Sequence, residues 1–312
     1  MAINKAMMAA LRALSYPDPD VKKTYRLERQ VQDLADRLRP KPTLYNSWDR
    51  EIPCGGRNVP VRIFAPPGGG TRRMLLFFHG GGWVVGSIDS YDTVCTNMAQ
   101  LTDCMVVSVD YRLAPEHPFP AGLEDCYAAA REAFLHAGPA GQLPEDIVLI
   151  GDSAGGNLAA AVSLMARDRG EFMPTRQVLL YPATYNDHTE TSPFASVREN
   201  GTDYLLTARR VQDFMDLYQS SPEDRYCPYF APLLAEDLAG QPQTLIVTAE
   251  YDPLRDEGEA YGQRLREAGV PVEIYRMADA LHGFLSLPPR FVHVTKLYEL
   301  LNRFLEGGQP EA

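Results

Sequence analysis

A serine flanked by glycines lies between an apolar run and a stretch typical of a helix. The run DIVLI at residues 146–150 leads into GDSAGGN at residues 151–157. A G-x-S-x-G motif between a strand and a helix predicts a turn so tight that the serine hydroxyl stands clear of the sheet. The sequence has neither the Lys-Ser/Thr pair of a P-loop nor a G-x-G-x-x-G motif, so nothing supports a phosphate cradle. The motif by itself leaves Ser153 as either a nucleophile or part of a glycine-rich turn.

A serine nucleophile needs a base that takes its proton and an acid that orients the base. The sequence has six histidines, and His282 follows the last strand-like run, at residues 272–278. Asp252 comes at the end of an earlier run, just past its apolar part, and Pro253 keeps that strand from continuing. We predict His282 as the base and Asp252 as the acid, with Glu250 in reserve. Serine, aspartate and histidine then follow one of the known orders of such triads along the chain.

Three consecutive glycines, at residues 80–82, interrupt the apolar stretch LLFFHGGGWVVGS at residues 75–87. Acyl transfer develops an oxyanion, which preorganised backbone N–H groups stabilise. One donor would be the N–H of Ala154, directly after the serine, and others would come from a loop after an earlier strand. Missing side chains would let the backbone approach a substrate closely, so we predict that the HGGG loop is this element. A flexible turn is the alternative.

Short apolar runs alternate with helical patterns from about residue 58 onward, and these elements must position the candidate residues. The runs lie at residues 59–66, 74–80, 104–111, 147–153, 177–183, 243–252 and 272–278, and the helical patterns lie at residues 90–102, 121–137, 155–170, 258–269 and 291–308. Several runs lack polar alternation, as strands buried on both faces do. This order predicts an α/β fold with a mostly parallel sheet and helices on both faces. Ligands bind beyond the carboxyl ends of the strands in such a sheet.

Two segments fall outside this alternation. At residues 25–40 Leu27, Val31, Leu34 and Leu38 recur at helical spacing, and we expect this apolar stripe to pack against the rest of the protein. Residues 184–230 are polar and aromatic with two short helical patches, and they fall between two good strands. We interpret them as an insertion over one end of the sheet.

Composition excludes several classes of function. The 312 residues carry a net charge of −11, which argues against nucleic acid and anionic membrane surfaces as partners. No apolar run approaches the roughly 20 residues of a membrane span. The five cysteines form no C-x-x-C pair, so the sequence does not predict a metal site. Scattered, reduced cysteines and an N-terminus without a cleavage signal favour a cytoplasmic protein.

Five separated motifs, in order, resemble the hormone-sensitive-lipase-like family of α/β-hydrolase esterases, in its bacterial GDSAG branch. They are HGGGW, VDYRLAPEHPFPAGLED, GDSAGGNLAAA, EYDPLRDEG and LHGF, and the likeness runs from about residue 58 to residue 305. The resemblance implies the triad Ser153, Asp252 and His282. It also implies Gly81, Gly82 and Ala154 as oxyanion donors, with Gly80 as a further candidate.

The resemblance further implies a single domain over residues 1–312, with a cap made from residues 1–45 and the insertion at residues 184–230. The expected function is a carboxylesterase that cleaves small, short-acyl esters through an acyl-enzyme, without metal or cofactor. Other serine hydrolase activities (deacetylase, lactonase or amidase) stay open, as does a non-catalytic binding protein of this fold.

Aromatic and apolar residues near the expected site are candidates for binding substrate. We predict that the pocket is lined by Trp83, Tyr185, Tyr204, Leu205 and Phe214, with ordinary packing as the alternative for each. An exposed final strand could also pair two copies of the chain, so a homodimer is expected.

Overall fold

Eight strands form one sheet in the order β1-β2-β4-β3-β5-β6-β7-β8 in the computed structural model, which describes residues 5–15, 18–38, 47–68, 73–136 and 141–307. The six strands from β4 to β8 in this order run parallel, whereas β1 and β2 are antiparallel to their neighbours. The predicted α/β class with a mostly parallel sheet is confirmed. The strands are β1 (Ser47–Cys54), β2 (Arg57–Phe64), β3 (Met74–Phe78), β4 (Met105–Val109), β5 (Ile147–Asp152), β6 (Arg176–Leu180), β7 (Gln243–Tyr251) and β8 (Val272–Leu281).

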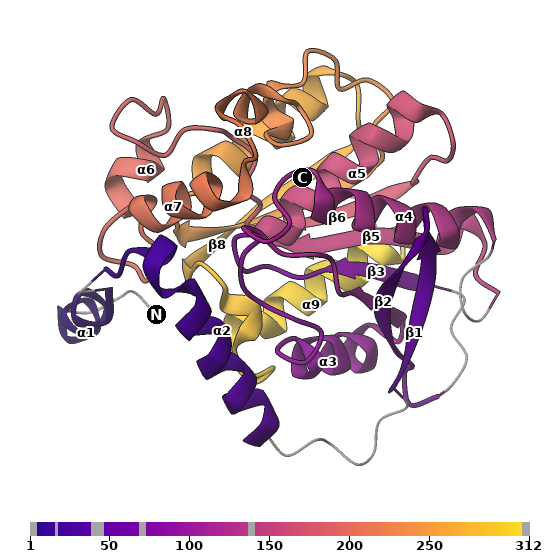
Figure 1. Cartoon of the computed structure of the whole chain (residues 1–312), viewed down its shortest axis with the longest axis horizontal. Coiled ribbons are helices and arrows are strands. Elements are labelled where there is room, and N and C mark those ends of the chain that lie inside the picture. Colours follow the sequence, from indigo (N-terminus) through magenta and orange to yellow (C-terminus); the bar gives the residue numbers. More distant parts are fainter. Residues whose placement is uncertain (1–4, 16–17, 39–46, 69–72, 137–140, 308–312) are drawn as a thin grey trace.

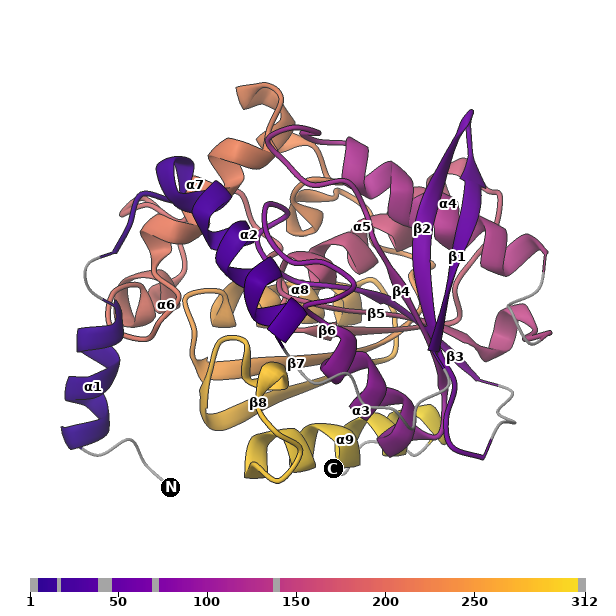
Figure 2. The same cartoon turned by 60° about the horizontal axis from the view of Figure 1, so that its bottom comes forward.

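Helices connect the strands and cover both faces of the sheet (Figures 1 and 2). The α-helices of the described residues are α1 (Lys5–Ser15), α2 (Val21–Leu38), α3 (Asp92–Thr102), α4 (Ala121–Leu135), α5 (Ala154–Arg169), α6 (Ala195–Asn200), α7 (Ala208–Tyr218), α8 (Arg255–Glu267) and α9 (Val292–Leu305). Short 3-10 helices lie at η1 (Pro144–Asp146), η2 (Pro222–Tyr226), η3 (Pro232–Leu234) and η4 (Phe284–Ser286). The two helical patches expected in the insertion correspond to α6 and α7.

The hydrophobic core has two layers, one on each face of the sheet. Strand β3 contributes Met74, Leu76 and Phe78 to one layer, where α4, α5 and α8 pack. Its Leu75 and Phe77 face the other layer, where α3 and α9 pack. Successive side chains of a strand point to opposite faces, so a strand covered on both faces reads as a continuous apolar run.

Strand β1 was not predicted, because most of its side chains are exposed and it has no apolar run. It pairs with β2 through a two-residue turn, in which Cys54 lies opposite Arg57. Gly55 and Gly56, between them, both have positive φ angles, of 51° and 94°. Two glycines between strands are a hairpin signal, so the sequence did carry the information that locates this strand.

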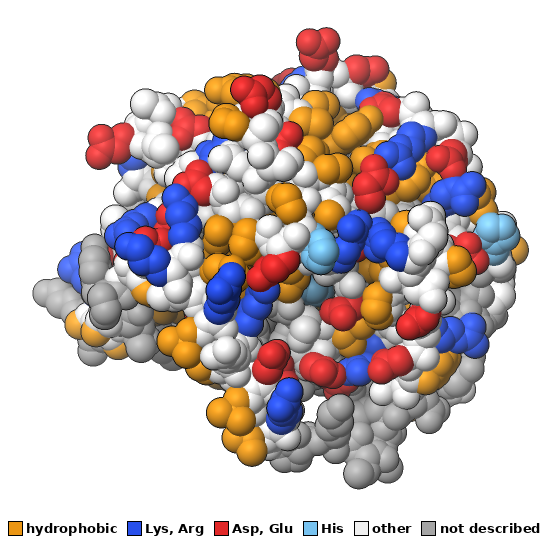
Figure 3. Space-filling view, viewed as in Figure 1, with side chains coloured by type: hydrophobic (Ala, Val, Ile, Leu, Met, Phe, Trp, Pro, Cys, Tyr) orange, Lys and Arg blue, Asp and Glu red, His pale blue; other side chains and the backbone are white. Residues whose placement is uncertain are grey.

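The apolar stripe predicted on α2 does not pack against the protein. Leu27, Val31, Leu34 and Leu38 are between 58% and 76% exposed, and apolar side chains are visible over this helix in Figure 3. The opposite face packs instead: Val21 and Tyr25 are buried, and one turn further on Arg29 donates to the carbonyl oxygens of Val84 and Ala114 at 2.7 and 2.6 Å. The expectation was wrong because the inward face of α2 ends in a hydrogen-bonding arginine rather than in leucines.

Candidate active site

Ser153 lies in the turn between β5 and α5, with φ 56° and ψ −119°. This backbone conformation is rare for a residue with a side chain, so it is held there by its surroundings. Gly155, two residues on, lies so close to β3 that a Cβ atom would overlap the carbonyl oxygen of Phe78. The glycine of the motif is therefore required by the packing of α5 against the sheet. The turn places the Ser153 hydroxyl at the carboxyl edge of the strands.

The structure brings Ser153, His282 and Asp252 together from three strand ends. His282 follows β8, and its Nε2 atom lies 2.9 Å from Ser153 Oγ. Its Nδ1 atom lies 2.6 Å from the carboxylate of Asp252, which follows β7 and is fully buried. The second carboxylate oxygen of Asp252 accepts the N–H of Leu254 at 2.9 Å. Glu250, the reserve acid, accepts the N–H of Asp279 instead.

The HGGG loop after β3 lines the same pocket as Ser153 through Gly81 and Gly82. The carbonyl oxygen of Gly81 accepts the N–H groups of Val84 and Val85, at 3.1 and 2.9 Å. A trans peptide directs its C=O and N–H groups to opposite sides, so these bonds fix the direction of the Gly82 N–H. Gly82 also lies against α7, where a Cβ atom would overlap the Phe214 ring.

The N–H of Gly80 is already engaged: it donates to Asp152 Oδ1 at 2.8 Å. A donor paired with a buried carboxylate is not available to a developing oxyanion, so we do not retain Gly80 among the candidate donors. The sequence could not reveal this, because Asp152 reaches the loop from a different strand. Gly81, Gly82 and Ala154 remain the candidates.

A pocket of about 280 Å³ opens above Ser153. Of the predicted lining residues, Trp83, Leu205 and Phe214 do line it. Tyr185 and Tyr204 lie outside its lining because each ring packs elsewhere: Tyr185 meets Phe194 edge-on at 5.1 Å, and Tyr204 stacks on Tyr251 at 4.8 Å, measured between ring centroids. Sequence reasoning missed other lining residues, namely Tyr91, Ala183, Leu206, Arg210, Val211, Leu254, Gly283 and Ser286. For Leu254 a signal existed, since it comes two residues after the predicted acid.

Comparison with known proteins agrees with this fold. A family model described as alpha/beta hydrolase fold matches residues 75–286. The chain is 38% identical to an arylesterase of Saccharolobus solfataricus, over 86% of this chain and 87% of that protein. It is 44% identical to the carboxylic ester hydrolase LipN of Mycobacterium tuberculosis, over 80% of this chain and 67% of that protein. A hyperthermophilic esterase of the archaeon Pyrobaculum calidifontis superposes with a TM-score of 0.85 at 36% identity, covering 98% of this chain and 99% of that one.

The chain belongs to the alpha/beta hydrolase family. The resemblance inferred from its five motifs is confirmed. The match of the family model begins in β3 and ends at η4, so it includes the HGGG loop and the three residues brought together at the strand ends.

Asp152 is a buried carboxylate directly before Ser153 in the sequence. Besides the Gly80 N–H, it accepts the hydroxyls of Tyr91 at 3.0 Å and Tyr181 at 3.4 Å. Burial raises the pKa of Asp152 to about 6, although these hydrogen bonds favour the ionised form. The ring of Tyr181 in turn meets His282 at a centroid distance of 4.8 Å. The Asp152 carboxylate thus connects the HGGG loop with the turn that carries Ser153, and through Tyr181 it reaches the ring of His282.

His79, the first residue of the HGGG motif, has a structural place in the hydrolase. It is fully buried, its Nδ1 atom lies 2.8 Å from the Gly80 carbonyl oxygen, and its ring stacks on Tyr111 at 4.3 Å. Burial lowers the pKa of His79, which favours the neutral ring. Within the part of the chain that the structure describes, no group of three or more His, Cys, Asp or Glu side chains could hold a metal ion. Among the same residues, none of the helices combines the length and the hydrophobicity that a membrane span requires.

Proposed function

We propose that this hydrolase is a carboxylesterase that cleaves small, short-acyl esters through Ser153, His282 and Asp252. The observation that carries the proposal is the chain of two short contacts, from Ser153 Oγ to His282 Nε2 at 2.9 Å and from His282 Nδ1 to Asp252 at 2.6 Å. The relatives reported above are named as esterases or ester hydrolases, which supports the same reaction.

The proposed reaction has two steps. Ser153 Oγ attacks the ester carbonyl carbon while His282 Nε2 takes the hydroxyl proton. Asp252 accepts the Nδ1–H of His282, which fixes the tautomer and stabilises the imidazolium. The N–H groups of Gly81, Gly82 and Ala154 are the proposed donors to the oxyanion. The histidine returns its proton to the departing alcohol. Water then attacks the acyl-enzyme while His282 takes a proton from it, and this proton passes to Ser153 Oγ as the carboxylic acid leaves.

The size of the pocket favours small substrates. Its volume of about 280 Å³ is at the lower end of ligand pockets, which start near 300 Å³. We propose that residues 1–45 and the insertion at residues 184–230 form a cap that closes it. In support, α7 supplies Arg210, Val211 and Phe214 to the pocket wall, and Arg210 is ion-paired to Glu28 of α2 at 3.0 Å. Residues 1–4, 16–17 and 39–45 of this proposed cap lie outside the described residues.

Two further properties belong to the proposal. All five cysteines are free thiols, which supports a reducing, cytoplasmic location. Among the described residues, strand β8 has one neighbour in the sheet, β7, so its outer edge could pair with the same edge of a second copy.

The proposed function is tested with p-nitrophenyl esters of increasing acyl length, on the wild type and on Ser153→Ala. We expect the wild type to hydrolyse short esters and to lose activity beyond about eight acyl carbons, when the chain outgrows the pocket. Ser153→Ala should lower kcat by about 10⁴-fold or more, because the nucleophile is removed. A fluorophosphonate probe should label only the wild type. Full activity in Ser153→Ala, or no hydrolysis by the wild type, would contradict the proposal.

A further inference from the structure

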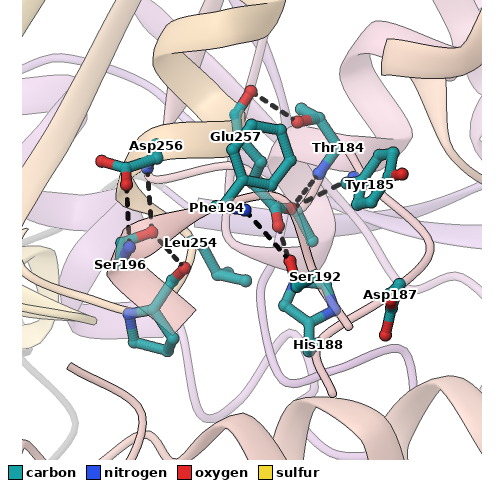
Figure 4. Close-up of polar contacts among 12 residues, drawn as sticks. Thr184, Tyr185, Asp187, His188, Ser192, Phe194, Ser196, Leu254, Asp256 and Glu257 are labelled. Carbon is teal, nitrogen blue, oxygen red and sulfur yellow. Dashed lines mark hydrogen bonds and ion pairs between the residues drawn. The ribbon is translucent and has the colours of Figure 1, made fainter. Parts of the chain in front are cut away.

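The segment that carries the proposed acid, residues 250–257, leaves the sheet after β7 and enters α8. Its backbone carbonyl groups are no longer paired in the sheet ladder beyond Tyr251. Side chains from residues 184–200 of the insertion contact this segment at three successive places, two of which are drawn in Figure 4. The position of the acid therefore depends on a part of the chain that carries no catalytic motif.

The first contact is made by Asn200, the last residue of α6. Its side-chain amide nitrogen donates to the carbonyl oxygens of Glu250 and Asp252, at 3.1 and 3.2 Å. Asn200 is only 4% exposed. One buried amide thus holds the Glu250–Tyr251 and Asp252–Pro253 peptide groups, and the second of these is part of the backbone of the acid itself. A buried carbonyl that lost this donor would have to find another partner, which makes the bond costly to break.

The second contact is made by Ser196, at the start of α6, which is fully buried. Its hydroxyl donates to the carbonyl oxygen of Pro253 at 2.8 Å and accepts the N–H of Asp256 at 3.2 Å. In return the Ser196 N–H donates to the Asp256 carboxylate at 2.8 Å (Figure 4). This reciprocal pair ties the first turn of α6 to the first turn of α8, immediately after the acid.

The third contact is a buried carboxylate, Glu257, at the start of α8. It accepts the backbone N–H groups of Thr184 and Tyr185, at 2.6 and 3.1 Å, and lies 2.6 Å from His188 Nε2 (Figure 4). The Thr184 hydroxyl donates back to the Glu257 carbonyl oxygen at 2.9 Å. The side chains of Glu257 and His188 are both fully buried. Buried charged or polar groups persist where they are paired, so this contact fixes where the insertion meets α8.

We propose that residues 184–200 of the insertion position the catalytic acid, with Asn200 as the principal positioning residue. The inference rests on the proposed function, in which Asp252 orients His282. Asp252 has a single short contact to the histidine, and its backbone is held from the insertion side by Asn200 and Ser196. Displacing a catalytic group by about 1 Å can cost about 100-fold in rate, so loosening this backbone lowers kcat rather than substrate binding. The insertion therefore does more than shape the pocket.

The test compares Asn200→Ala with Thr207→Ala. Thr207 is a matched control, since it is a buried polar residue of the same insertion with the same 4% exposure, but its side chain binds Asp18 and caps α7. For Asn200→Ala we expect kcat on p-nitrophenyl acetate to fall about 10-fold or more, with KM within about twofold of the wild type. Thr207→Ala should keep kcat within about twofold, since it loses a helix cap and the bond to Asp18, and neither touches the segment that carries the acid.

A second readout does not depend on turnover. The Nδ1–H of His282, which donates to Asp252, should give a far-downfield proton resonance in NMR spectra, and Asp252→Asn identifies it by removing it. Asn200→Ala should shift or broaden this resonance, whereas Thr207→Ala should leave it in place. If Asn200→Ala does not fold, Ser196→Ala replaces it, because this variant removes a single hydroxyl. Its kcat and its downfield resonance then test the inference in the same way.

Two results would overturn the inference. One is a folded Asn200→Ala, or Ser196→Ala in its place, with the kcat and the downfield resonance of the wild type. The other is an equal fall in kcat for Thr207→Ala, which would show a general effect of disturbing the insertion. Failure of the proposed function is distinguishable, because it would appear as absent esterase activity in the wild type.

Discussion

At the scale of single residues, Asp152 shows how the site uses a buried charge. Its carboxylate is enclosed beside Ser153, where it holds Gly80 and two tyrosine hydroxyls. Burial raises its pKa from the ordinary 3.8 to about 6, so the fold binds its proton more tightly than the unfolded chain does. The stabilisation that comes from the protonated form is complete below pH 3.8 and is lost as the pH rises through about 6.

We therefore expect Asp152→Asn to be more stable than the wild type at pH 8 and to lose this advantage near pH 4. The rise in pKa corresponds to at most about 3 kcal/mol in the free energy of unfolding at high pH. Urea unfolding at both pH values measures the difference. Asp125→Asn is the control: this buried aspartate is paired with Arg112 at 2.9 Å, so weakening the pair should destabilise the protein at pH 8 rather than stabilise it. An equal effect of Asp152→Asn at pH 4 and pH 8 would contradict the prediction.

At the scale of elements, the HGGG loop and the insertion are fitted to each other. Gly82 has a φ of 59°, and the Phe214 ring of α7 fills the space where a side chain would stand. The loop comes from the sheet and the ring from the insertion, so the predicted donor group and the predicted pocket residue restrain one another. This fit explains why a glycine is needed at this position.

Gly82→Ala should lower kcat by about 10²-fold, because the added methyl group must move either the loop or α7. Phe214→Ala alone should act mainly on KM, since it enlarges the pocket. The double variant should recover much of the kcat lost in Gly82→Ala, because the obstructing ring is gone. Steady-state kinetics of the three variants give the coupling energy. Strictly additive losses would show that the clash does not matter.

At the scale of the whole molecule, the two edges of the sheet differ. The first edge, β1, presents exposed charged residues, which discourage pairing with another chain. The other edge, β8, carries buried or half-buried side chains at eight of its ten positions, and no strand of the described residues lies beside its outer edge. The asymmetry favours β8 as the contact in the proposed homodimer.

Light scattering over a range of protein concentrations should therefore give the mass of two chains at micromolar concentration. Hydrogen exchange should at the same time be slower for the amides of β8 than for those of β1, because pairing protects the outer edge. A mass of one chain at high concentration, or fast exchange along the whole of β8, would contradict the dimer.

Much of the fold follows from local pattern. A strand covered on both faces is apolar throughout, and an amphipathic helix repeats every three to four residues, so β2 to β8 and the main helices can be predicted without tertiary information. Ser153 was predicted as the nucleophile from its glycine spacing, and Asp252 and His282 were predicted as acid and base from their places just after strands. Strand β1 was missed, although Gly55 and Gly56 mark its turn.

The sequence by itself determined which residue types follow which strands, because those signals lie within a few neighbouring positions. Only the tertiary structure decided how distant segments pair. It directed the Gly80 N–H to Asp152, left the α2 leucines exposed, and placed Asn200 against the backbone of Asp252. The physical reason is that a polar group bonds to, and an apolar face packs against, whichever groups the tertiary packing places beside it. The local sequence pattern does not specify that partner.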